Sequence, residues 1–211
     1  SANDIFARTS VLEQILSSGG GWQDQVGGIY PSLKLTTTKA DMTQLPDVNW
    51  LPEKVFAEAI RSGRAMLYYT GITRVARNIL SEIVKSIFLN KAETMSIIND
   101  ISLNAKFIAD ALQKNDSVSF DEGIRRSWQL NRELDKGTCP PAIKGIIEQI
   151  APFDPACKLL GAGGGGYMLI LAKDTASAAA IRESLTTNAP NPRARFVDLE
   201  ISHTGIQITR S

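Results

Sequence analysis

Apolar residues recur at helical spacing through most of this chain, and short apolar or β-branched runs interrupt them. Spacings of three and four residues predict an amphipathic helix wherever they persist over several turns. Glycine and proline residues end most of these segments. The predicted helices span residues 6–17, 53–61, 74–87, 95–113, 120–134, 141–150 and 175–186.

The short runs between the helices predict strands at residues 33–38, 65–69, 167–171, 193–198 and 205–209. Loop residues are expected over 41–49, with Pro46 and Pro52 as breakers. This order of strands and helices predicts an α+β fold in which helices cover an antiparallel sheet.

Buried positions can also be assigned from the pattern. Trp128 and Leu134 are expected to pack within the helical layer. Six apolar residues of the helix at 74–87 are expected to form a buried stripe. They are Ala76, Ile79, Leu80, Ile83, Val84 and Ile87.

Composition narrows the function classes. The 211 residues are 43% hydrophobic and 21% charged, which fits one large globular domain or two small ones. A formal net charge of +1 argues against a nucleic-acid or membrane-surface partner. Two cysteines and one histidine offer no metal-ligand spacing, and free thiols favour a reducing cytoplasm. No signal peptide precedes the first helix, and because the chain begins with Ser1 we expect an excised fragment.

The glycine-rich stretch at residues 19–28 is the first candidate site. If Trp22 opens a helix, Asp24 lies in its first turn among unpaired backbone N–H groups. Gly27 and Gly28 then share the face of Asp24 and leave room for a small molecule beside the acid. Alternatively, Asp24 only complements the helix dipole.

The corner after the strand at 65–69 is the second candidate. Arg74 and Asn78 lie four residues apart near the start of the following helix, off its apolar stripe. They contact an anion or a hydroxyl group, or they are simply solvated.

A second glycine cluster formally contains G-x-G-x-x-G at Gly161, Gly163 and Gly166. The dinucleotide fingerprint requires a helix after the glycines, whereas a strand is predicted here, and no G-K-[ST] follows for a P-loop. Either the cluster is a flexible linker, or it is a tight loop whose backbone braces a ligand site. We favour the loop.

Three blocks in this order carry a family resemblance: residues 20–28 with Pro31 and Lys34 behind them, residues 69–80, and residues 161–166. Together they resemble the carboxyl-terminal half of the sugar kinases of the GHMP superfamily, and among these the L-fucokinases. The heptose-phosphate kinases, such as the D-glycero-D-manno-heptose 7-phosphate kinases, share Gly-Trp-Gln-Asp-Gln but usually lack the Val-Gly-Gly continuation, and they rank second.

The resemblance implies a single carboxyl-terminal domain over residues 1–211 with a ferredoxin-like sandwich. It also implies an ATP-dependent phosphotransferase that converts L-fucose to L-fucose 1-phosphate, with Mg²⁺ bridging the phosphates. The family's Pro-x-x-x-Gly-x-Gly-Ser-Ser nucleotide loop lies in an amino-terminal lobe and is not found in this sequence. We therefore expect the fragment alone to be inactive and its partners to be the sugar, ATP and that lobe of the same parent chain.

The resemblance also assigns roles to residues. Asp24 corresponds to the acid that faces the sugar hydroxyl as a base or an orienting group. The substrate-binding positions implied are Trp22, Gln23, Gln25, Thr70, Gly71 and Arg74. Support for the phosphate loop is implied for Gly161, Gly163, Gly164, Gly165 and Gly166.

Two function classes compete with the kinase. One is a non-catalytic ligand-binding module on the same α+β fold, since fold does not fix function. The other is a dinucleotide-binding oxidoreductase domain, which the strand after the glycines disfavours.

Overall fold

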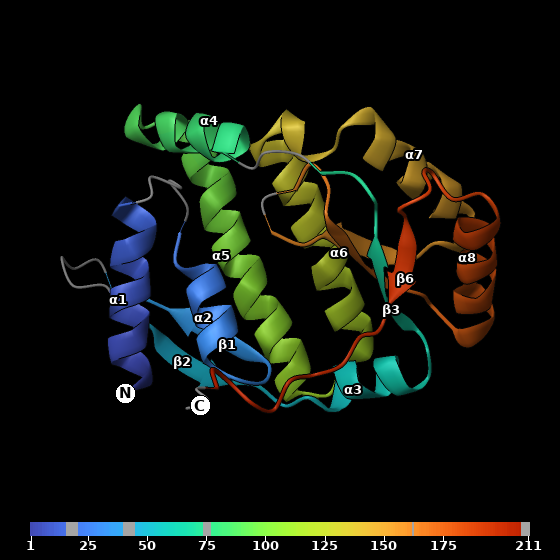
Figure 1. The fold of residues 1–211 in the computed structure, drawn as a ribbon, viewed down its shortest axis with the longest axis horizontal. Coiled ribbons are helices and arrows are strands. Elements are labelled where there is room, and N and C mark those ends of the chain that lie inside the picture. Colours follow the sequence, from blue (N-terminus) through green and yellow to red (C-terminus); the bar gives the residue numbers. More distant parts are fainter. Residues whose placement is uncertain (16–20, 40–44, 74–76, 162, 208–211) are drawn as a thin grey trace, which may run out of the picture. The chain divides into compact units, whose positions relative to one another are not determined.

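The computed structural model describes residues 1–15, 21–39, 45–73, 77–161 and 163–207. The chain divides into two compact units, one made of Ser1–Glu53 with Ile201–Ser211 and the other of Lys54–Glu200. Figure 1 shows the elements of both units. The single domain expected over residues 1–211 stays a prediction.

Unit 1 holds two helices and a two-stranded antiparallel sheet: α1 (Ala2–Ile15), α2 (Gln23–Ile29), β1 (Lys34–Thr37) and β2 (Asp47–Trp50). Its small core joins Phe6 of α1 to Val26 and Ile29 of α2, all of them buried. The Tyr30 hydroxyl donates to Asn3 Oδ1 at 2.5 Å and ties the end of α2 to α1. These contacts fix α2, the helix that carries Asp24.

Strand β2 was not predicted, and the expected loop is wrong at residues 47–49. Its sequence Asp-Val-Asn-Trp is short and half polar, so pairing with β1 rather than its own pattern makes it a strand. The strand expected at 205–209 is also wrong at 205–207, where Ile206 N–H only donates to the Ile29 carbonyl at 3.2 Å. Residues 41–44, 208 and 209 lie outside the described residues.

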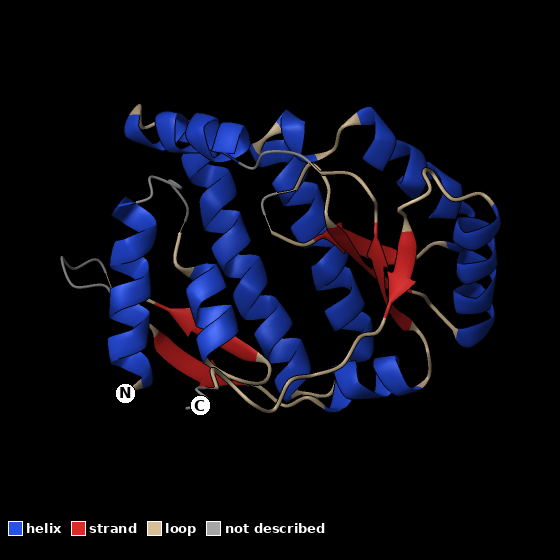
Figure 2. Cartoon of the chain, in the orientation of Figure 1, coloured by secondary structure: helices blue, strands red, loops and turns tan. Residues whose placement is uncertain are grey.

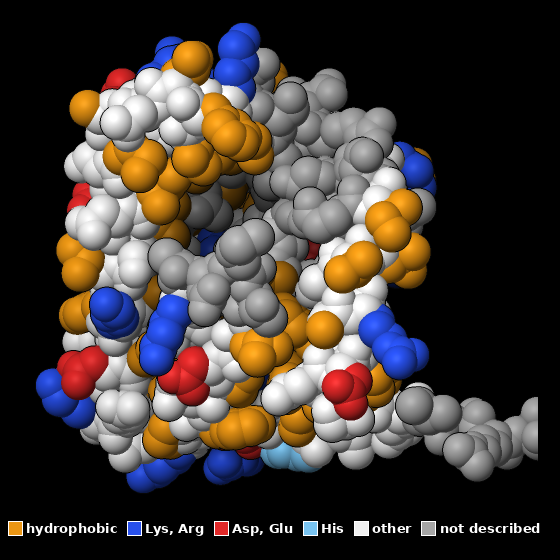
Figure 3. Space-filling view, turned by 90° about the vertical axis from the view of Figure 1, so that its left-hand side faces the viewer, with side chains coloured by type: hydrophobic (Ala, Val, Ile, Leu, Met, Phe, Trp, Pro, Cys, Tyr) orange, Lys and Arg blue, Asp and Glu red, His pale blue; other side chains and the backbone are white. Residues whose placement is uncertain are grey.

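Helix α1 forms where helical spacing predicts it, yet part of its apolar side faces solvent. Val11, Leu12 and Ile15 are 60%, 53% and 72% exposed. The face of the molecule in Figure 3 accordingly shows hydrophobic side chains interspersed with charged ones.

Unit 2 is built on a four-stranded sheet of order β4-β5-β3-β6, in which each neighbouring pair is antiparallel. The strands are β3 (Ala65–Tyr69), β4 (Ala156–Leu159), β5 (Tyr167–Leu171) and β6 (Arg195–Val197). The predicted α+β class with an antiparallel sheet is therefore confirmed. Strand β4 was not predicted, because its four residues include a lysine and run directly into glycines.

Helices surround this sheet, as Figure 2 shows. The α-helices are α3 (Lys54–Arg61), α4 (Arg77–Phe88), α5 (Ala92–Gln113), α6 (Ser117–Leu134), α7 (Pro141–Ile150) and α8 (Thr175–Thr187). Two 3-10 turns, η1 (Lys136–Thr138) and η2 (Ala151–Phe153), flank α7. Within the described residues, no helix is long and apolar enough to span a membrane.

The core of unit 2 lies between the sheet and the helices α7 and α8. Met168 and Ile170, which alternate along β5, are fully buried in it. Ile146 of α7 and Ile181 of α8 pack in the same cluster. Alternate residues of β5 therefore face this core, where they meet helix residues spaced three and four apart, and the rest of β5 beyond Tyr167 is buried as well.

Trp128 of α6 is buried in this core, as predicted, whereas Leu134 is only half-buried. The stripe predicted along α4 is wrong at Ile87, which is 40% exposed, and Ile83 and Val84 are half-buried. A periodic pattern predicts the helix but not what covers its apolar side. Ala76 and the side chains of Ile79 and Leu80 lie outside the described residues.

Candidate functional site

The second glycine cluster forms the loop of a β-hairpin. It joins β4 to β5, and the Leu160 N–H donates to the Tyr167 carbonyl at 2.9 Å where the strands part. Both strands lie in the core sheet, so the chain is held at each end of the loop. The described residues of the cluster therefore form a loop held between two strands and not a flexible linker. That the loop braces a ligand site stays a prediction.

The turn after β3 holds this loop from a distant part of the sequence. The backbone N–H and the Oγ1 hydroxyl of Thr70 both donate to the Gly166 carbonyl, each at 2.9 Å. The Gly166 N–H in turn donates to the Ile72 carbonyl at 2.9 Å. Thr70 is fully buried, and its partners Gly166 and Ile72 are half-buried. They fix the glycine loop to the corner that follows β3.

Asn191 braces the same corner from the loop between α8 and β6. Its Nδ2 donates to the Thr70 carbonyl at 2.8 Å, and its Oδ1 accepts from the Arg193 N–H at 3.0 Å. Gly71, at φ +68°, lies so close to the Asn191 amide that a Cβ there would collide with it. The amide nitrogen of Asn191 therefore holds the corner after β3, and its amide oxygen holds the loop before β6.

Thr138, at the end of η1, closes the other side of the loop. Its carbonyl accepts from the Gly164 N–H at 2.8 Å, and a Cβ on Gly163 would lie 2.6 Å from its Cγ2. A Cβ on Gly165 would collide with the Ile72 carbonyl oxygen. Glycine is required here because backbone from two other segments approaches the loop closely.

The N–H groups of Gly163 and Gly165 have no acceptor among the described residues, unlike those of Gly164 and Gly166. Unpaired N–H groups in a glycine-rich turn can form an anion-binding concavity. Such groups suit a phosphate or a carboxylate, and the surrounding clamps hold them in place. Ala162 lies outside the described residues.

Lys158 lies on β4 just before this loop. Its Nζ donates to the Ser127 hydroxyl of α6 at 2.9 Å, and burial lowers the pKa of the ammonium group. No carboxylate is recorded beside it among the described residues. Lys158 therefore ties α6 to the strand that feeds the loop.

The first candidate, in unit 1, has the local geometry expected from its sequence. Trp22 precedes α2, and Asp24 lies in the first turn with its side chain exposed. A Cβ on Gly27 or Gly28 would meet nothing within 4 Å, so backbone is open to solvent beside the acid. Space for a small molecule exists on this face, and the role of Asp24 stays a prediction.

Other residues of this block support α2. Trp22 packs edge-on against Phe6, with ring centroids 6.3 Å apart. Gln23 is exposed, whereas the Gln25 Oε1 is buried without a donor among the described residues. Lys34 donates from Nζ to the carbonyls of Tyr30 and Ser32 at 2.8 and 3.1 Å, and burial lowers its pKa. Lys34 thereby closes the turn that follows α2.

The structure thus joins some of the predicted residues and not others. Thr70, Gly71 and the loop glycines form one hydrogen-bonded cluster in unit 2, while Asp24 and its neighbours belong to unit 1. Arg74 lies outside the described residues. The described part of the chain holds no group of three or more His, Cys, Asp or Glu side chains placed to bind a metal.

Sequence reasoning missed Asn191 and Thr138. Asn191 lies between Pro190 and Pro192, where a proline-rich loop signal hides its role. Its partner Thr70 is 121 residues away, and a pairing over that distance leaves no local pattern. Thr138 acts mainly through its carbonyl, which any residue could supply.

Comparison with known proteins agrees with this architecture. Residues 108–191 match the family described as GHMP kinases C terminal. The chain is 46% identical over 209 residues to the L-fucokinase/L-fucose-1-P guanylyltransferase of Bacteroides fragilis. The matched region makes up 99% of this chain and 22% of that protein. It is 32% identical over 190 residues to the bifunctional fucokinase/GDP-fucose pyrophosphorylase of Arabidopsis thaliana. This match covers 89% of this chain and 18% of that protein. The chain therefore spans about a fifth of the length of these relatives.

Solved structures share the fold at low identity. The Lin0012 protein from Listeria innocua matches with a TM-score of 0.77 at 14% identity, over 100% of this chain and 62% of that chain. The L. major mevalonate kinase in complex with R-mevalonate matches with a TM-score of 0.59 at 14% identity, over 92% and 63%. At these identities the likeness concerns the fold alone. The family resemblance inferred from the three sequence blocks is confirmed by the family match and the two relatives.

Proposed function

We propose that this chain, which carries a GHMP kinase C-terminal domain in residues 108–191, is part of an ATP-dependent kinase that phosphorylates L-fucose at C1. The clamped glycine hairpin is the structural observation that supports the proposal, because it offers the N–H groups of Gly163 and Gly165 to an anion. The choice of sugar rests on the names of the two relatives, each of which includes fucokinase activity.

Phosphoryl transfer through a loose transition state depends mainly on positioning and on charge stabilisation. In the proposed enzyme, the hairpin loop supports the phosphate side of the site, and Thr70 and Gly71 hold it in place. Asp24 accepts the proton of the attacking sugar hydroxyl or orients that hydroxyl. Trp22, Gln23, Gln25 and Arg74 are proposed to contact the sugar.

ATP is the proposed phosphoryl donor, and Mg²⁺ is proposed to arrive with its phosphates. The described residues supply no cluster of metal ligands, so we derive no step through the ion. An amino-terminal lobe of the same polypeptide is the proposed carrier of the main nucleotide loop. Cytoplasmic location and a role in GDP-fucose salvage are part of this proposal, and the two free cysteines support the former.

Substitution of Asp24 tests the proposal in the longer polypeptide. Asp24→Asn keeps the shape of the side chain but removes the proton acceptor. A general base contributes about 10²- to 10⁴-fold, so kcat with L-fucose should fall by about that factor while KM changes little. Glu93→Gln is the matched control, since Glu93 is an exposed acid in the first turn of α5. Its kcat should equal that of the wild type.

A well-folded Asp24→Asn enzyme with wild-type turnover would assign the acid to the helix dipole alone. The substrate class is tested separately, by comparing L-fucose with D-glycero-D-manno-heptose 7-phosphate in the wild type. Faster turnover of the heptose phosphate would favour the heptose kinases that rank second. Binding of L-fucose without turnover of ATP would favour the non-catalytic module.

A further inference from the structure

The chain enters β6 through a turn that Asn191 organises. The Asn191 carbonyl accepts from the Ala194 N–H at 3.1 Å, and its side-chain Oδ1 accepts from the Arg193 N–H at 3.0 Å. Pro192 comes next, and a proline restricts the backbone of the residue before it as well as its own. Asparagine followed by proline is a favoured way to begin such a turn. The backbone and the amide oxygen of Asn191 are therefore fixed by its own turn.

The amide nitrogen of Asn191 reaches a segment far away in the sequence. Its Nδ2 donates to the Thr70 carbonyl at 2.8 Å, and Gly71 lies against the same amide, where a Cβ would collide with it. Thr70 is fully buried, so solvent does not replace this donor when it is removed. A buried carbonyl that loses its donor costs free energy. The geometry of the corner after β3 therefore depends on the Asn191 side chain.

The corner passes this constraint on to the glycine loop. The Thr70 N–H and hydroxyl both donate to the Gly166 carbonyl, and the Gly166 N–H donates to the Ile72 carbonyl. The Ile72 carbonyl oxygen also lies where a Cβ of Gly165 would be. Thr70 and Ile72 therefore hold the part of the loop around Gly165, whose N–H has no acceptor among the described residues.

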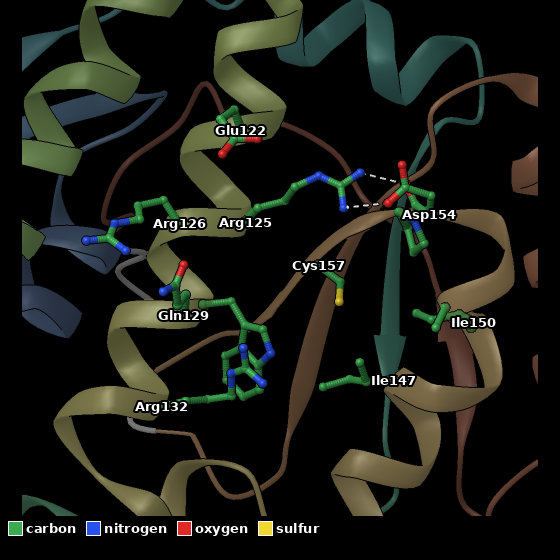
Figure 4. Close-up of a pocket in the computed structure, with 12 residues that line it drawn as sticks. Glu122, Arg125, Arg126, Gln129, Arg132, Ile147, Ile150, Asp154 and Cys157 are labelled. Atoms are coloured by element: carbon green, nitrogen blue, oxygen red, sulfur yellow. Dashed lines mark hydrogen bonds and ion pairs between the residues drawn. The ribbon is translucent and has the colours of Figure 1, made fainter.

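Unit 2 also contains a cavity of about 430 Å³ among α6, α7 and β4. Figure 4 shows Arg125 in its wall, pointing toward Asp154, to which it donates at 2.9 Å. The described residues of the lining include neither Asn191 nor any part of the corner or the glycine loop. Asn191 is therefore linked to the loop by direct hydrogen bonds and not through this cavity.

We propose that Asn191 is a positioning residue of the kinase site and acts on the phosphate side of the reaction. Through Thr70 and Ile72, its amide holds the glycine loop where the Gly165 N–H faces a phosphate group of ATP. This inference rests on the proposed function. Asparagine suits the position because it combines an acceptor for its own turn with a donor for the corner, whereas aspartate lacks the donor.

Amide hydrogen exchange of the 211-residue chain, followed by NMR, tests this linkage without ATP. Asn191→Asp keeps the size and the acceptor of the side chain but removes the donor. We expect the Thr70 and Gly166 N–H groups to exchange at least about tenfold faster, because the corner opens locally more often. The Gly164 N–H, bonded to the Thr138 carbonyl on the other side of the loop, should keep its wild-type rate. An unchanged Gly166 rate, or equal acceleration of Gly164 and Gly166, would overturn the linkage.

Two further variants separate position from charge. Asn191→Ala removes the donor without adding a charge and should accelerate the same two N–H groups. Asn188→Asp adds the same charge three residues earlier, at an exposed residue whose recorded hydrogen bonds use only its backbone, and should exchange like the wild type. Circular dichroism checks that each variant is folded. A fast Gly166 N–H in Asn188→Asp, or a slow one in Asn191→Ala, would assign the effect to charge and overturn the proposal.

Steady-state kinetics of the longer polypeptide test the catalytic consequence. In Asn191→Asp and Asn191→Ala, KM for ATP should rise and kcat should fall. Together they should lower kcat/KM for ATP by about 10- to 100-fold, the cost of a small misplacement in a site. KM for L-fucose should change little, because the loop lies on the phosphate side. A merely structural role would reduce the amount of active enzyme, which lowers kcat and leaves both KM values unchanged.

The outcomes distinguish this inference from the proposed function. A wild type that phosphorylates L-fucose, together with Asn191 variants whose KM for ATP is unchanged, would overturn the role of Asn191 alone. A wild type that does not phosphorylate L-fucose would overturn the proposed function and with it the catalytic role of Asn191. The exchange rates of Thr70 and Gly166 then still decide whether Asn191 holds the loop.

Discussion

Thr70 and Gly166, 96 residues apart, are joined by two hydrogen bonds to one carbonyl oxygen. The Thr70 Oγ1 also accepts from the Ile72 N–H at 3.3 Å, so a single hydroxyl serves both the turn and the hairpin loop. This relationship makes the geometry of the glycine loop depend on β3, a central strand of the sheet.

Thr70→Val should therefore destabilise unit 2 by about 1–3 kcal/mol, because the half-buried Gly166 carbonyl loses one of its two donors and the Ile72 N–H loses its acceptor. Thr70→Ser keeps the hydroxyl and should lose less. Stability is measured by urea unfolding, with Trp128 fluorescence as the reporter in a chain whose Trp22 and Trp50 are replaced by Phe. Trp128 then reports on unit 2 alone. A Val variant as stable as the Ser variant would show that the hydroxyl contributes nothing.

Gly165→Ala should destabilise unit 2 by about 1–3 kcal/mol, since its Cβ meets the Ile72 carbonyl oxygen and backbone must move. Gly145→Ala is the matched control, because a Cβ there meets nothing within 4 Å on an exposed position of α7. Alanine in a helix interior should stabilise that variant by about 0.5–1 kcal/mol. The same urea measurement compares the two variants. A Gly165→Ala variant with the free energy of unfolding of the wild type would mean that the loop backbone moves without loss of stability.

Asp174 caps α8, and its cap should be sensitive to acid. The Ser177 N–H donates to Asp174 Oδ1 at 2.7 Å, and this bond lowers the carboxyl pKa below its ordinary value of 3.8. The carboxylate therefore stabilises the fold above pH 3.8, and this stabilisation is lost as the pH falls through the lower, folded pKa. Asp174→Ala should have a lower free energy of unfolding than the wild type at pH 7, and the difference between the two proteins should become smaller below pH 3.8.

Asp174→Asn separates the cap from its charge. Asparagine caps a helix about as well as aspartate but does not titrate. The Asn variant should therefore keep a higher free energy of unfolding than the Ala variant at low pH as well as at pH 7. Urea unfolding between pH 2 and pH 7 measures all three proteins. A gap between wild type and Ala variant that stays constant with pH would contradict the hydrogen-bonded cap.

Cys157 should resist alkylation in the folded chain. The thiolate is the reactive form, and burial raises the pKa of this thiol to about 11. Cys139 is only half-buried, although burial raises its pKa as well. With iodoacetamide at pH 8, mass spectrometry should find Cys139 modified at least about tenfold faster, and both modified alike in 8 M urea. Equal rates in the folded chain would contradict the burial of Cys157.

Local patterns predicted most helices closely, and α7 at its observed bounds, because each carries apolar residues at helical spacing and clear end signals. They failed at β2 and β4, four-residue strands that depend on their partners. They also failed at Ile87, whose exposure depends on what packs against α4. Which strands pair, and which segments bury the apolar side of a helix, depend on distant parts of the chain. A short stretch of sequence therefore does not predict them.

The site shows the same division. The glycine run predicted a loop at residues 161–166, and the strand predicted after it disfavoured a dinucleotide fold from sequence alone. What holds the loop was not predictable, since Thr138 acts through a carbonyl and Asn191 through an amide far along the chain. Backbone contacts of this kind place little demand on residue type.

Unit 1 is assembled from both ends of the described chain, and this has a consequence for synthesis. The Ser32 N–H donates to the Ser202 carbonyl at 2.8 Å, and the turn after α2 is completed only by residues beyond Glu200. A ribosome therefore delivers the whole of unit 2 before unit 1 has its last segment. Domains generally fold as units while the chain emerges. In this protein the later-starting unit is the first to be complete, and the turn after α2 is closed only once Ser202 has been synthesised.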